Sequence, residues 1–281
     1  MARSHGLIVS QPVVVRDLSN VLVHLRPAPV VARVATTTAV VREGGAVAWL
    51  ERDVQVASYL AAAGLPVVPP AGELPPGPHL HDGLAISFWR FVDHDPSRPV
   101  EAAQVGALLR EVHEALATFP GELRPLRAVL EEIGLVLDHL GAEASLGAHD
   151  LGLLRAALAR VRPLVTDPWL GAQALHGDAH AGNLLSTPDG PLWTDFEDAC
   201  SGSPLWDLAC LVGAGRLFGP DSERAEAALR AYGVPAEEEL APFVEARALQ
   251  VAAWTALMAE RHPQVRDQAD ARLAWWRERA D

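Results

Sequence analysis

The sequence contains no lysine, so all 23 basic residues are arginines, and 36 acidic residues bring the net charge to −13. Nucleic acids and anionic membrane surfaces attract basic surfaces, which this charge balance disfavours. Cysteine is scarce as well, since Cys200 and Cys210 are the only two and their spacing is not that of a metal-binding pair. No apolar run reaches the roughly 18 residues of a membrane-spanning helix. We therefore expect a cytoplasmic protein that binds neither nucleic acid nor membranes.

Hydrophobic residues are abundant, at 49% of the 281 positions, which indicates a globular protein with one large core or two lobes. Between Val13 and Val41, β-branched runs at Val13–Val15, Val21–Leu25 and Val30–Val34 alternate with turn-forming residues. This pattern predicts an antiparallel sheet. A later apolar run, Leu84–Val92, predicts one more strand, buried on both faces.

Apolar residues at helical spacing predict a helix over Ala46–Ala63, and the proline-rich stretch Val67–Asp82 after it is predicted to be a surface loop. Beyond Val92 the same spacing predicts a mainly helical chain. The helices predicted there cover Glu101–Thr118, Ala128–Leu140, Asp150–Val161 with its end at Pro163, Ser222–Ala231, Ala236–Glu260 and Gln264–Ala280. The fold class expected from these elements is α+β.

The most informative stretch runs from Leu175 to Leu211. It contains His176-Gly177-Asp178, then Asn183, then Asp195-Phe196, and a turn signal at residues 187–190 separates two short apolar runs. Apolar runs around an Asp-Gly turn predict a β-hairpin. With Asp189-Gly190 near its tip, Gly182 or Asn183 lies opposite Thr194 or Asp195, so Asn183 and Asp195 meet at the open end.

These residue types suit phosphoryl transfer. An amide oxygen from Asn183 and a carboxylate from Asp195 are ligands for a hard ion such as Mg²⁺, which bridges substrate phosphates. Asp178 precedes them on a loop and is available to take a proton from a hydroxyl. Glu197 and Asp198 lie close by and are expected to support the site or face solvent rather than bind the metal.

The order HGD-x4-N, D-F and G-x4-D-L-A resembles the catalytic segment of the aminoglycoside phosphotransferase family, whose fold is related to protein kinases. The resemblance implies a nucleotide-binding lobe at residues 1–92 and a helical lobe at 93–281. It implies that Asp178 is the catalytic aspartate and that Asn183 and Asp195 hold Mg²⁺. It further implies that Asp207 braces the catalytic loop, although Asp207 alone also suits the first turn of a helix. His176 is expected to support the loop.

The same resemblance assigns the nucleotide site. It implies that a loop at Ser19 and Asn20 covers the nucleotide phosphates. Arg33 stands where the family has a phosphate-binding lysine, and Asp53 stands where it has a glutamate, so an ion pair between them is expected. The alternative to this ion pair is that Asp53 is a solvated helix residue. The strand that ends near residue 92 is expected to present the backbone of Arg90 and Val92 to the adenine edge.

The implied activity is transfer of the γ-phosphate of ATP, or of GTP, to a hydroxyl of a small molecule. Two alternatives remain open. The substitutions at Arg33 and Asp53 allow a non-catalytic, kinase-like binding protein, and His176, Asp178 and His180 allow a zinc hydrolase. For the acceptor, the negative net charge, the run Glu237–Glu239 and the pair Glu197 and Asp198 beside the hairpin favour an amino-bearing molecule, aminoglycoside-like or an amino alcohol. The glutamate run also suits a solvated helix start.

Overall fold

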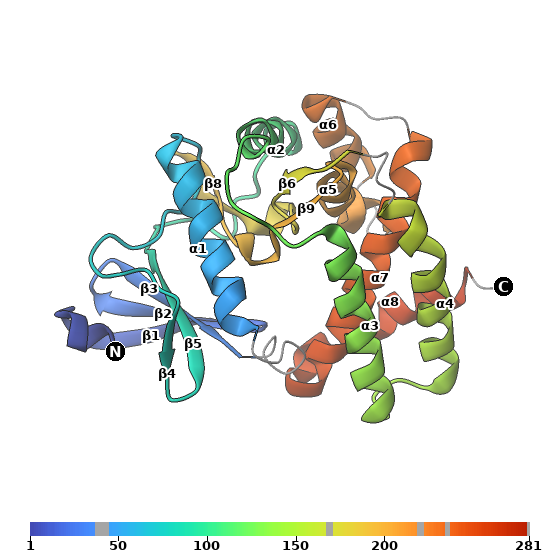
Figure 1. Ribbon diagram of the computed structural model, residues 1–281, viewed down its shortest axis with the longest axis horizontal. Helices are drawn as coiled ribbons and strands as arrows, with labels where there is room; N and C mark the ends of the chain where they lie inside the picture. Colours follow the sequence, from blue (N-terminus) through green and yellow to red (C-terminus); the bar gives the residue numbers. More distant parts are fainter. Residues whose placement is uncertain (37–44, 167–170, 218–221, 234–236, 280–281) are drawn as a thin grey trace.

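The computed structural model describes residues 1–36, 45–166, 171–217, 222–233 and 237–279. Figure 1 shows a sheet at one end of the molecule and a group of helices at the other, with short strands between them. The α+β fold class predicted from the sequence is confirmed. A continuous hydrophobic core runs from the helix beside the sheet into the helical part.

The sheet has five strands in the order β1-β2-β3-β5-β4, and each neighbouring pair is antiparallel. The strands are β1 (Val9–Asp17), β2 (Asn20–Pro27), β3 (Val30–Ala35), β4 (His79–His81) and β5 (Leu84–Arg90). The predicted antiparallel sheet is therefore present, and residues 37–41 of the predicted region lie outside the described residues. Register places Arg33 on β3 between Leu22 of β2 and Ser87 of β5.

Helix α1 (Ala46–Ala62) lies between the sheet and the helical part (Figure 1). Its buried residues Trp49, Asp53, Val56 and Leu60 recur every three to four positions, so one stripe of the helix faces the core. Asp53 belongs to this stripe and is fully buried. The alternative that Asp53 is a solvated helix residue is therefore wrong.

The segment Val67–Asp82 is not simply the predicted surface loop, because Val67, Val68, Ala71 and Leu74 are buried and β4 lies at its end. The prolines lack an amide hydrogen, but their carbonyl groups still accept hydrogen bonds. Pro69 accepts from the amide of Arg90 (3.1 Å), and Pro76 accepts from that of Phe88 (2.7 Å). These bonds attach the segment to β5.

The helical part follows the predicted order, with ends that shift by a few residues. Its helices are α2 (Ala102–Leu116), α3 (Leu126–Ala142), α4 (Ala148–Val165), α5 (Leu205–Leu217), α6 (Ser222–Tyr232), α7 (Glu237–Arg261) and α8 (Arg266–Arg277). Short 3-10 turns are η4 (Ala181–Asn183), η5 (Phe196–Asp198) and η6 (Pro263–Val265) here, and η1 (Ala2–His5) before β1. Ala236 and Ala280, at two predicted helix ends, lie outside the described residues. Pro163 does not end α4 as predicted, because the helix continues to Val165.

Two small antiparallel pairs lie between the sheet and the helices. Strand β6 (Gln173–Leu175) pairs with β9 (Cys200–Gly202), and β7 (Leu184–Thr187) pairs with β8 (Gly190–Trp193). They place the stretch with the HGD motif at the centre of the molecule (Figure 1). None of the described helices is both long enough and apolar enough to cross a membrane.

Candidate active site

The predicted hairpin is present, with Thr187 paired to Gly190 at the turn and Leu184 paired to Trp193 at the open end. The amide of Thr194 donates to the carbonyl of Asn183 at 2.9 Å, which extends the pairing by one residue. Asn183 and Asp195 therefore leave the open end of the hairpin side by side, as the expected register required.

The loop that carries Asp178 is fixed by Asp207 in the first turn of α5. One carboxylate oxygen of Asp207 accepts from the amide of His176 at 2.7 Å, and the other accepts from that of Gly177 at 2.8 Å. His113 contacts the same carboxylate at 2.9 Å, and the Trp206 indole donates to the Gly177 carbonyl at 2.8 Å. Asp207 is fully buried, so these bonds hold the loop in a water-free setting.

His176 is fully buried and packs against the rings of Trp193 and Phe196. Burial lowers the pKa of His176 below 6.5, although the charges of Asp207 and Asp178 act in the opposite direction. Within the described residues, no three His, Cys, Asp or Glu side chains gather as a metal site, so His176, Asp178 and His180 do not form the zinc centre of the hydrolase alternative.

Arg33 connects the sheet, α1 and the hairpin. Its guanidinium contacts Asp53 at 3.0 Å, Glu197 at 2.8 Å, and Asp195. The ion pair expected between Arg33 and Asp53 is thus present, and two further acids share the same cation. Asp53 also accepts a hydrogen bond from the amide of Phe196 at 2.8 Å, which attaches α1 to the D-F motif.

Three carboxylates around one guanidinium leave an excess of negative charge in a buried cluster. Burial, together with the neighbouring Asp195 and Glu197, raises the pKa of Asp53 to about 8 against the opposing charge of Arg33. The pKa of Arg33 is raised well above its ordinary value, because the attraction of the acids outweighs the effect of burial. Two buried polar atoms, Nε of Arg33 and Oδ1 of Asn20, have no hydrogen-bond partner in the described part of the chain.

Asn20 is also part of this cluster, because its Nδ2 donates to Glu197 at 3.0 Å. Glu197 is therefore buried rather than solvated, and it supports the site by linking the Ser19–Asn20 turn to the D-F motif. No local sequence pattern indicates this link, because Asn20 and Glu197 are 177 positions apart.

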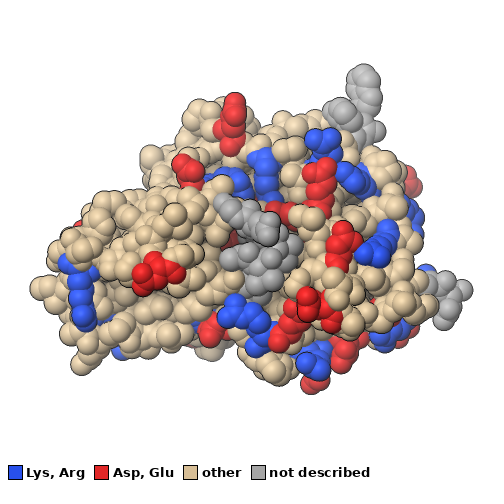
Figure 2. Space-filling view, turned by 60° about the horizontal axis from the view of Figure 1, so that its bottom comes forward, with Lys and Arg blue, Asp and Glu red and all other residues tan. Residues whose placement is uncertain are grey.

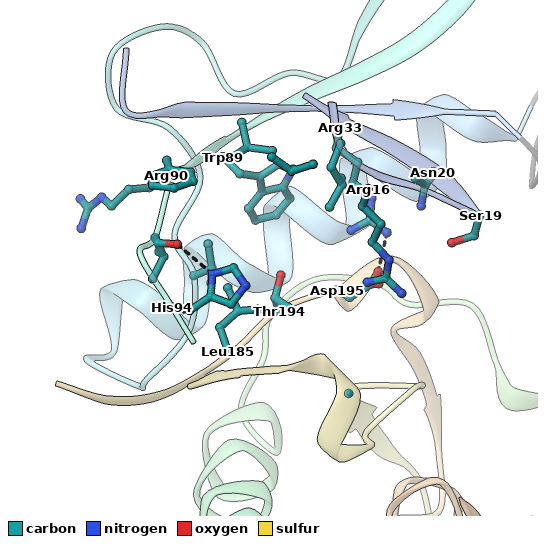
Figure 3. A pocket seen from close by; sticks show the side chains of 17 residues that line it. Arg16, Ser19, Asn20, Arg33, Trp89, Arg90, His94, Leu185, Thr194 and Asp195 are labelled. Atoms are coloured by element: carbon teal, nitrogen blue, oxygen red, sulfur yellow. Dashed lines mark hydrogen bonds and ion pairs between the residues drawn. The ribbon is translucent and has the colours of Figure 1, made fainter. Parts of the chain in front are cut away.

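A first cleft opens between the sheet and the hairpin (Figure 3). Val31, Val68, Trp89 and Leu185 give it apolar walls, while Ser19, Asn20, Arg33 and Asp195 lie at one end. Arg90 lies at the other end (Figure 3), and Val92, two residues further along the chain, also lines the cleft. The amide of Arg90 is bonded to Pro69 and the carbonyl of Val92 accepts from His94 (3.0 Å), whereas the Val92 amide makes no hydrogen bond within the described residues. This end therefore offers a backbone donor to a ligand.

Asn183 and Asp195 fit a hard divalent cation. The Nδ2 of Asn183 donates to the carbonyl and to Oδ2 of Asp178, at 2.9 and 3.1 Å. These two bonds do not use the side-chain Oδ1 of Asn183. Asp195 uses one oxygen for Arg33 and keeps the other for a ligand. An amide and a carboxylate oxygen at one cleft are the donors that Mg²⁺ accepts while keeping waters and phosphates as its other ligands.

A second cleft lies between the HGD loop and helices α7 and α8, and Arg16, Leu18 and Ser19 also line it. Arg247 of α7 is buried there, and its guanidinium contacts the carboxylate of Asp178 and the side chain of Gln250. Burial raises the pKa of Asp178, but the charge of Arg247 outweighs this and holds the pKa well below its usual range. Asp178 is therefore ionised at neutral pH.

Arg247 was not among the residues predicted for the site. The sequence feature that could have indicated it is the helical spacing, which places Arg247 and Gln250 on the same face as the buried Phe243 and Ala246. A charged residue on a buried helix face needs a charged partner. Here that partner is Asp178, 69 residues earlier in the chain.

The family model described as the phosphotransferase enzyme family matches residues 13–243 of this chain. No curated protein matches the chain by sequence at a significant level. Among solved structures, a thermostable mutant of the aminoglycoside phosphotransferase APH(4)-Ia superposes with a TM-score of 0.65 at 15% identity, over 99% of this chain and 98% of that chain.

Two other solved structures show the same architecture. A choline/ethanolamine kinase family protein from Mesorhizobium loti has a TM-score of 0.63 and 21% identity, and covers 96% of this chain and 87% of its own. The amicoumacin kinase hAmiN, solved with AMP-PNP, Ca²⁺ and Ami, has a TM-score of 0.64 and 13% identity, with 98% of this chain and 92% of that chain covered. The two-lobed, protein-kinase-like fold implied by the sequence resemblance is confirmed.

Proposed function

The chain belongs to the phosphotransferase enzyme family, and from this premise we propose that it transfers the γ-phosphate of ATP or GTP to a hydroxyl of a small molecule. One observation carries the proposal. Asp178, Asn183 and Asp195 together line the second cleft, Asp195 also lines the first, and Asp207 and Arg33 hold the loop and hairpin that carry them. A nucleotide on one side and an acceptor on the other would both reach this point.

We assign the first cleft to the nucleotide. Its apolar walls suit the base, and the Arg90 carbonyl and Val92 amide are assigned to the base edge. Arg33, with its unbonded Nε, and the turn at Ser19 and Asn20 are assigned to the phosphates. The boundary between the nucleotide-binding lobe (1–92) and the helical lobe (93–281) is proposed to lie at this hinge.

We assign Asn183 and Asp195 to Mg²⁺, which when bound neutralises charge on the phosphates. Asp178 orients the acceptor hydroxyl through a carboxylate oxygen and accepts its proton as the new O–P bond forms and the bond to the nucleoside diphosphate breaks. Its low pKa keeps Asp178 ionised before the reaction. His176 and Asp207 are assigned to the support of this loop, since both are buried behind it.

Of the acids that favoured an amino-bearing acceptor, only Glu197 and Asp198 line the second cleft. Glu238 and Glu239 are exposed at the start of α7 and do not line the second cleft, and the side chain of Glu237 is outside the described residues. Glu197 is paired with Arg33 at 2.8 Å, and Asp198 lies 3.4 Å from Arg124. The amino-bearing acceptor remains a hypothesis that rests on the net charge and on Glu197 and Asp198, both of which already contact an arginine.

An ADP- and GDP-release screen over hydroxyl acceptors, with Mg²⁺ and each nucleotide, tests the proposal. We expect the rate of nucleoside diphosphate release to increase with acceptor concentration for one class of acceptor. Nucleotide binding without acceptor-dependent release for any class would support the non-catalytic binding protein instead.

A further inference from the structure

The backbone of the HGD loop and the carboxylate of Asp178 are held by different residues. Asp207 bonds two backbone amides of the loop, and these bonds do not restrain the Asp178 side chain. On that side chain, the Nδ2 of Asn183 donates to Oδ2 at 3.1 Å, and His180 lies 3.4 Å from the same oxygen. The guanidinium of Arg247 contacts Oδ1. The carboxylate is therefore held from the hairpin on one side and from α7 on the other.

Arg247 is itself fixed at both ends of its side chain. Its neighbours Ala246 and Leu249 on α7 are fully buried, so the backbone at this point belongs to the core. Arg247 as a whole is only 9% exposed. Its Nη1 donates to Oε1 of Gln250, three residues further along the helix, while Nη2 donates to Asp178. Because the guanidinium is planar, these two bonds together fix the direction from which it meets the carboxylate.

The bond from Arg247 leaves Asp178 with room for a hydroxyl. Each oxygen of an ionised carboxylate has two lone pairs. Within the described residues Oδ1 has Arg247 as its one partner, whereas Oδ2 has both Asn183 and His180 beside it. The side chain of Asp178 is 21% exposed, and both Asp178 and Arg247 line the second cleft. An acceptor hydroxyl in this cleft therefore has an unused lone pair on Oδ1, next to the bond from Arg247.

We infer that Arg247 is a positioning residue for the transfer step, because it holds Oδ1 of Asp178 and so sets the direction in which that carboxylate meets the acceptor hydroxyl. The inference rests on the proposed kinase function and adds to it a residue outside the sequence motifs. Arg247 does not line the first cleft, so its role belongs to the acceptor side. A misplacement of about 1 Å at a reacting group typically costs about 10²-fold in rate.

The first test uses Arg247→Gln, with Arg266→Gln as the matched control, since Arg266 is exposed at the start of α8 and does not line the second cleft. The acceptor is the hydroxyl compound that gives the fastest ADP release in the screen above. We expect Arg247→Gln to lower kcat on the order of 10- to 100-fold, with an unchanged Kd for Mg²⁺ and AMP-PNP in calorimetry. Arg266→Gln should behave like wild type. A wild-type kcat in folded Arg247→Gln would overturn the inference.

A buried ion pair can also serve stability alone, and Arg247→Lys separates the two roles. This variant keeps a cation beside Asp178, so it should fold even where Arg247→Gln does not. One ammonium group cannot reproduce the planar contacts to both Asp178 and Gln250. Arg247→Lys should therefore keep most of the stability in urea and recover only part of kcat. A wild-type kcat in this variant would contradict the positioning role, because charge alone would then suffice.

A double-mutant cycle tests whether Arg247 acts through Asp178. The value of kcat is measured for Asp178→Asn, for Arg247→Gln and for the double variant. If Arg247 only positions Asp178, the double variant should lose no more than Asp178→Asn loses alone, because residues that act as a unit are not additive. Losses that multiply would mean that Arg247 serves the transferred phosphoryl group or the acceptor directly, and they would refute the positioning role.

The inference and the proposed function fail differently. If the wild-type protein releases no ADP with any acceptor, the kinase function is contradicted, and the positioning role falls with it. If the wild-type protein turns over an acceptor and Arg247→Gln does so at the same rate, only the positioning role is contradicted and the kinase function stands.

Discussion

Arg33 occupies an unusual position, because its one guanidinium faces Asp53, Asp195 and Glu197 in a buried cluster. In a chain without lysine, arginine is the only permanent cation available for this place. Its planar fork can contact several carboxylates at once, which an ammonium group achieves less well.

Replacing Arg33 should affect both stability and nucleotide binding. Arg33→Met leaves buried acids without their cation, which typically costs about 3–5 kcal/mol of unfolding free energy. Arg33→Lys keeps the charge, so it should lose less stability and raise the nucleotide KM. Urea unfolding and steady-state kinetics measure the two effects. Wild-type stability and wild-type KM in Arg33→Met would show that the cluster does not depend on this residue.

A second residue-scale prediction concerns pH. His176 is buried with a pKa below 6.5, so the folded state binds fewer protons on this ring than the unfolded state does. Its contribution to stability is complete above pH 6.5 and is lost as the pH falls from there towards the lowered pKa. The unfolding free energy should decrease over that window, and His176→Asn should flatten the decrease.

The control for this prediction is His149→Asn, because His149 is exposed. That variant should keep the wild-type slope of unfolding free energy against pH. If His176→Asn keeps the same slope too, the acid sensitivity arises from another group.

At the scale of elements, the catalytic loop depends on a close approach of two backbones. Gly177 has φ of +87°, and a Cβ added there would lie 1.9 Å from the carbonyl oxygen of Asp198. Gly64, after α1, has a similar φ of +80° but open space around it. The two glycines therefore separate the cost of the backbone conformation from the cost of the clash.

Gly64→Ala should lose only the conformational cost, roughly 1–2 kcal/mol. Gly177→Ala must in addition displace η5 or the HGD loop, so it should lose more stability and nearly all activity. Chemical unfolding of both variants, with activity assayed in parallel, makes the comparison. Equal losses would show that the loop accommodates the added methyl group.

Sequence reasoning succeeded where structure follows from local pattern. The hairpin register follows from one turn signal, and it placed Asn183 beside Asp195 correctly. It failed where distant residues decide the outcome. Whether Asp53 is solvated, and whether Arg247 reaches Asp178, depends on packing between segments far apart in the chain. The Val67–Asp82 segment was predicted to be a surface loop, but part of it is buried because proline carbonyl groups accept hydrogen bonds from a strand of the sheet.

At the scale of the whole molecule, the net charge of −13 does not identify the acceptor. On the face shown in Figure 2, arginines and acids are interspersed over the helical part, and the sheet part carries few charges. Net charge averages over the surface, whereas recognition depends on the few side chains that line a cleft. The second cleft is lined by three arginines, Arg16, Arg247 and Arg272, and by four acids, Asp178, Asp195, Glu197 and Asp198.

Nucleotide binding should require a divalent cation, because Asp195 lines the part of the first cleft that we assign to the phosphates and would repel them if their charge were uncompensated. At a free nucleotide concentration of about 100 times Kd, Mg²⁺ and AMP-PNP should stabilise the fold by about 2.7 kcal/mol. Excess EDTA should remove this stabilisation, as measured by thermal unfolding. An undiminished shift in EDTA would remove Asn183 and Asp195 from the proposed metal site.

The central claim, that Asp178 serves transfer rather than nucleotide binding, is tested most directly by Asp178→Asn. Acceptor-dependent ADP release should fall by about 10²–10⁴, the usual effect of losing a positioned base, while calorimetry should give an unchanged Kd for Mg²⁺ and AMP-PNP. Asp189→Asn at the exposed hairpin tip is the matched control and should behave like wild type. Near-normal turnover in Asp178→Asn, with its fold intact, would contradict the proposed mechanism.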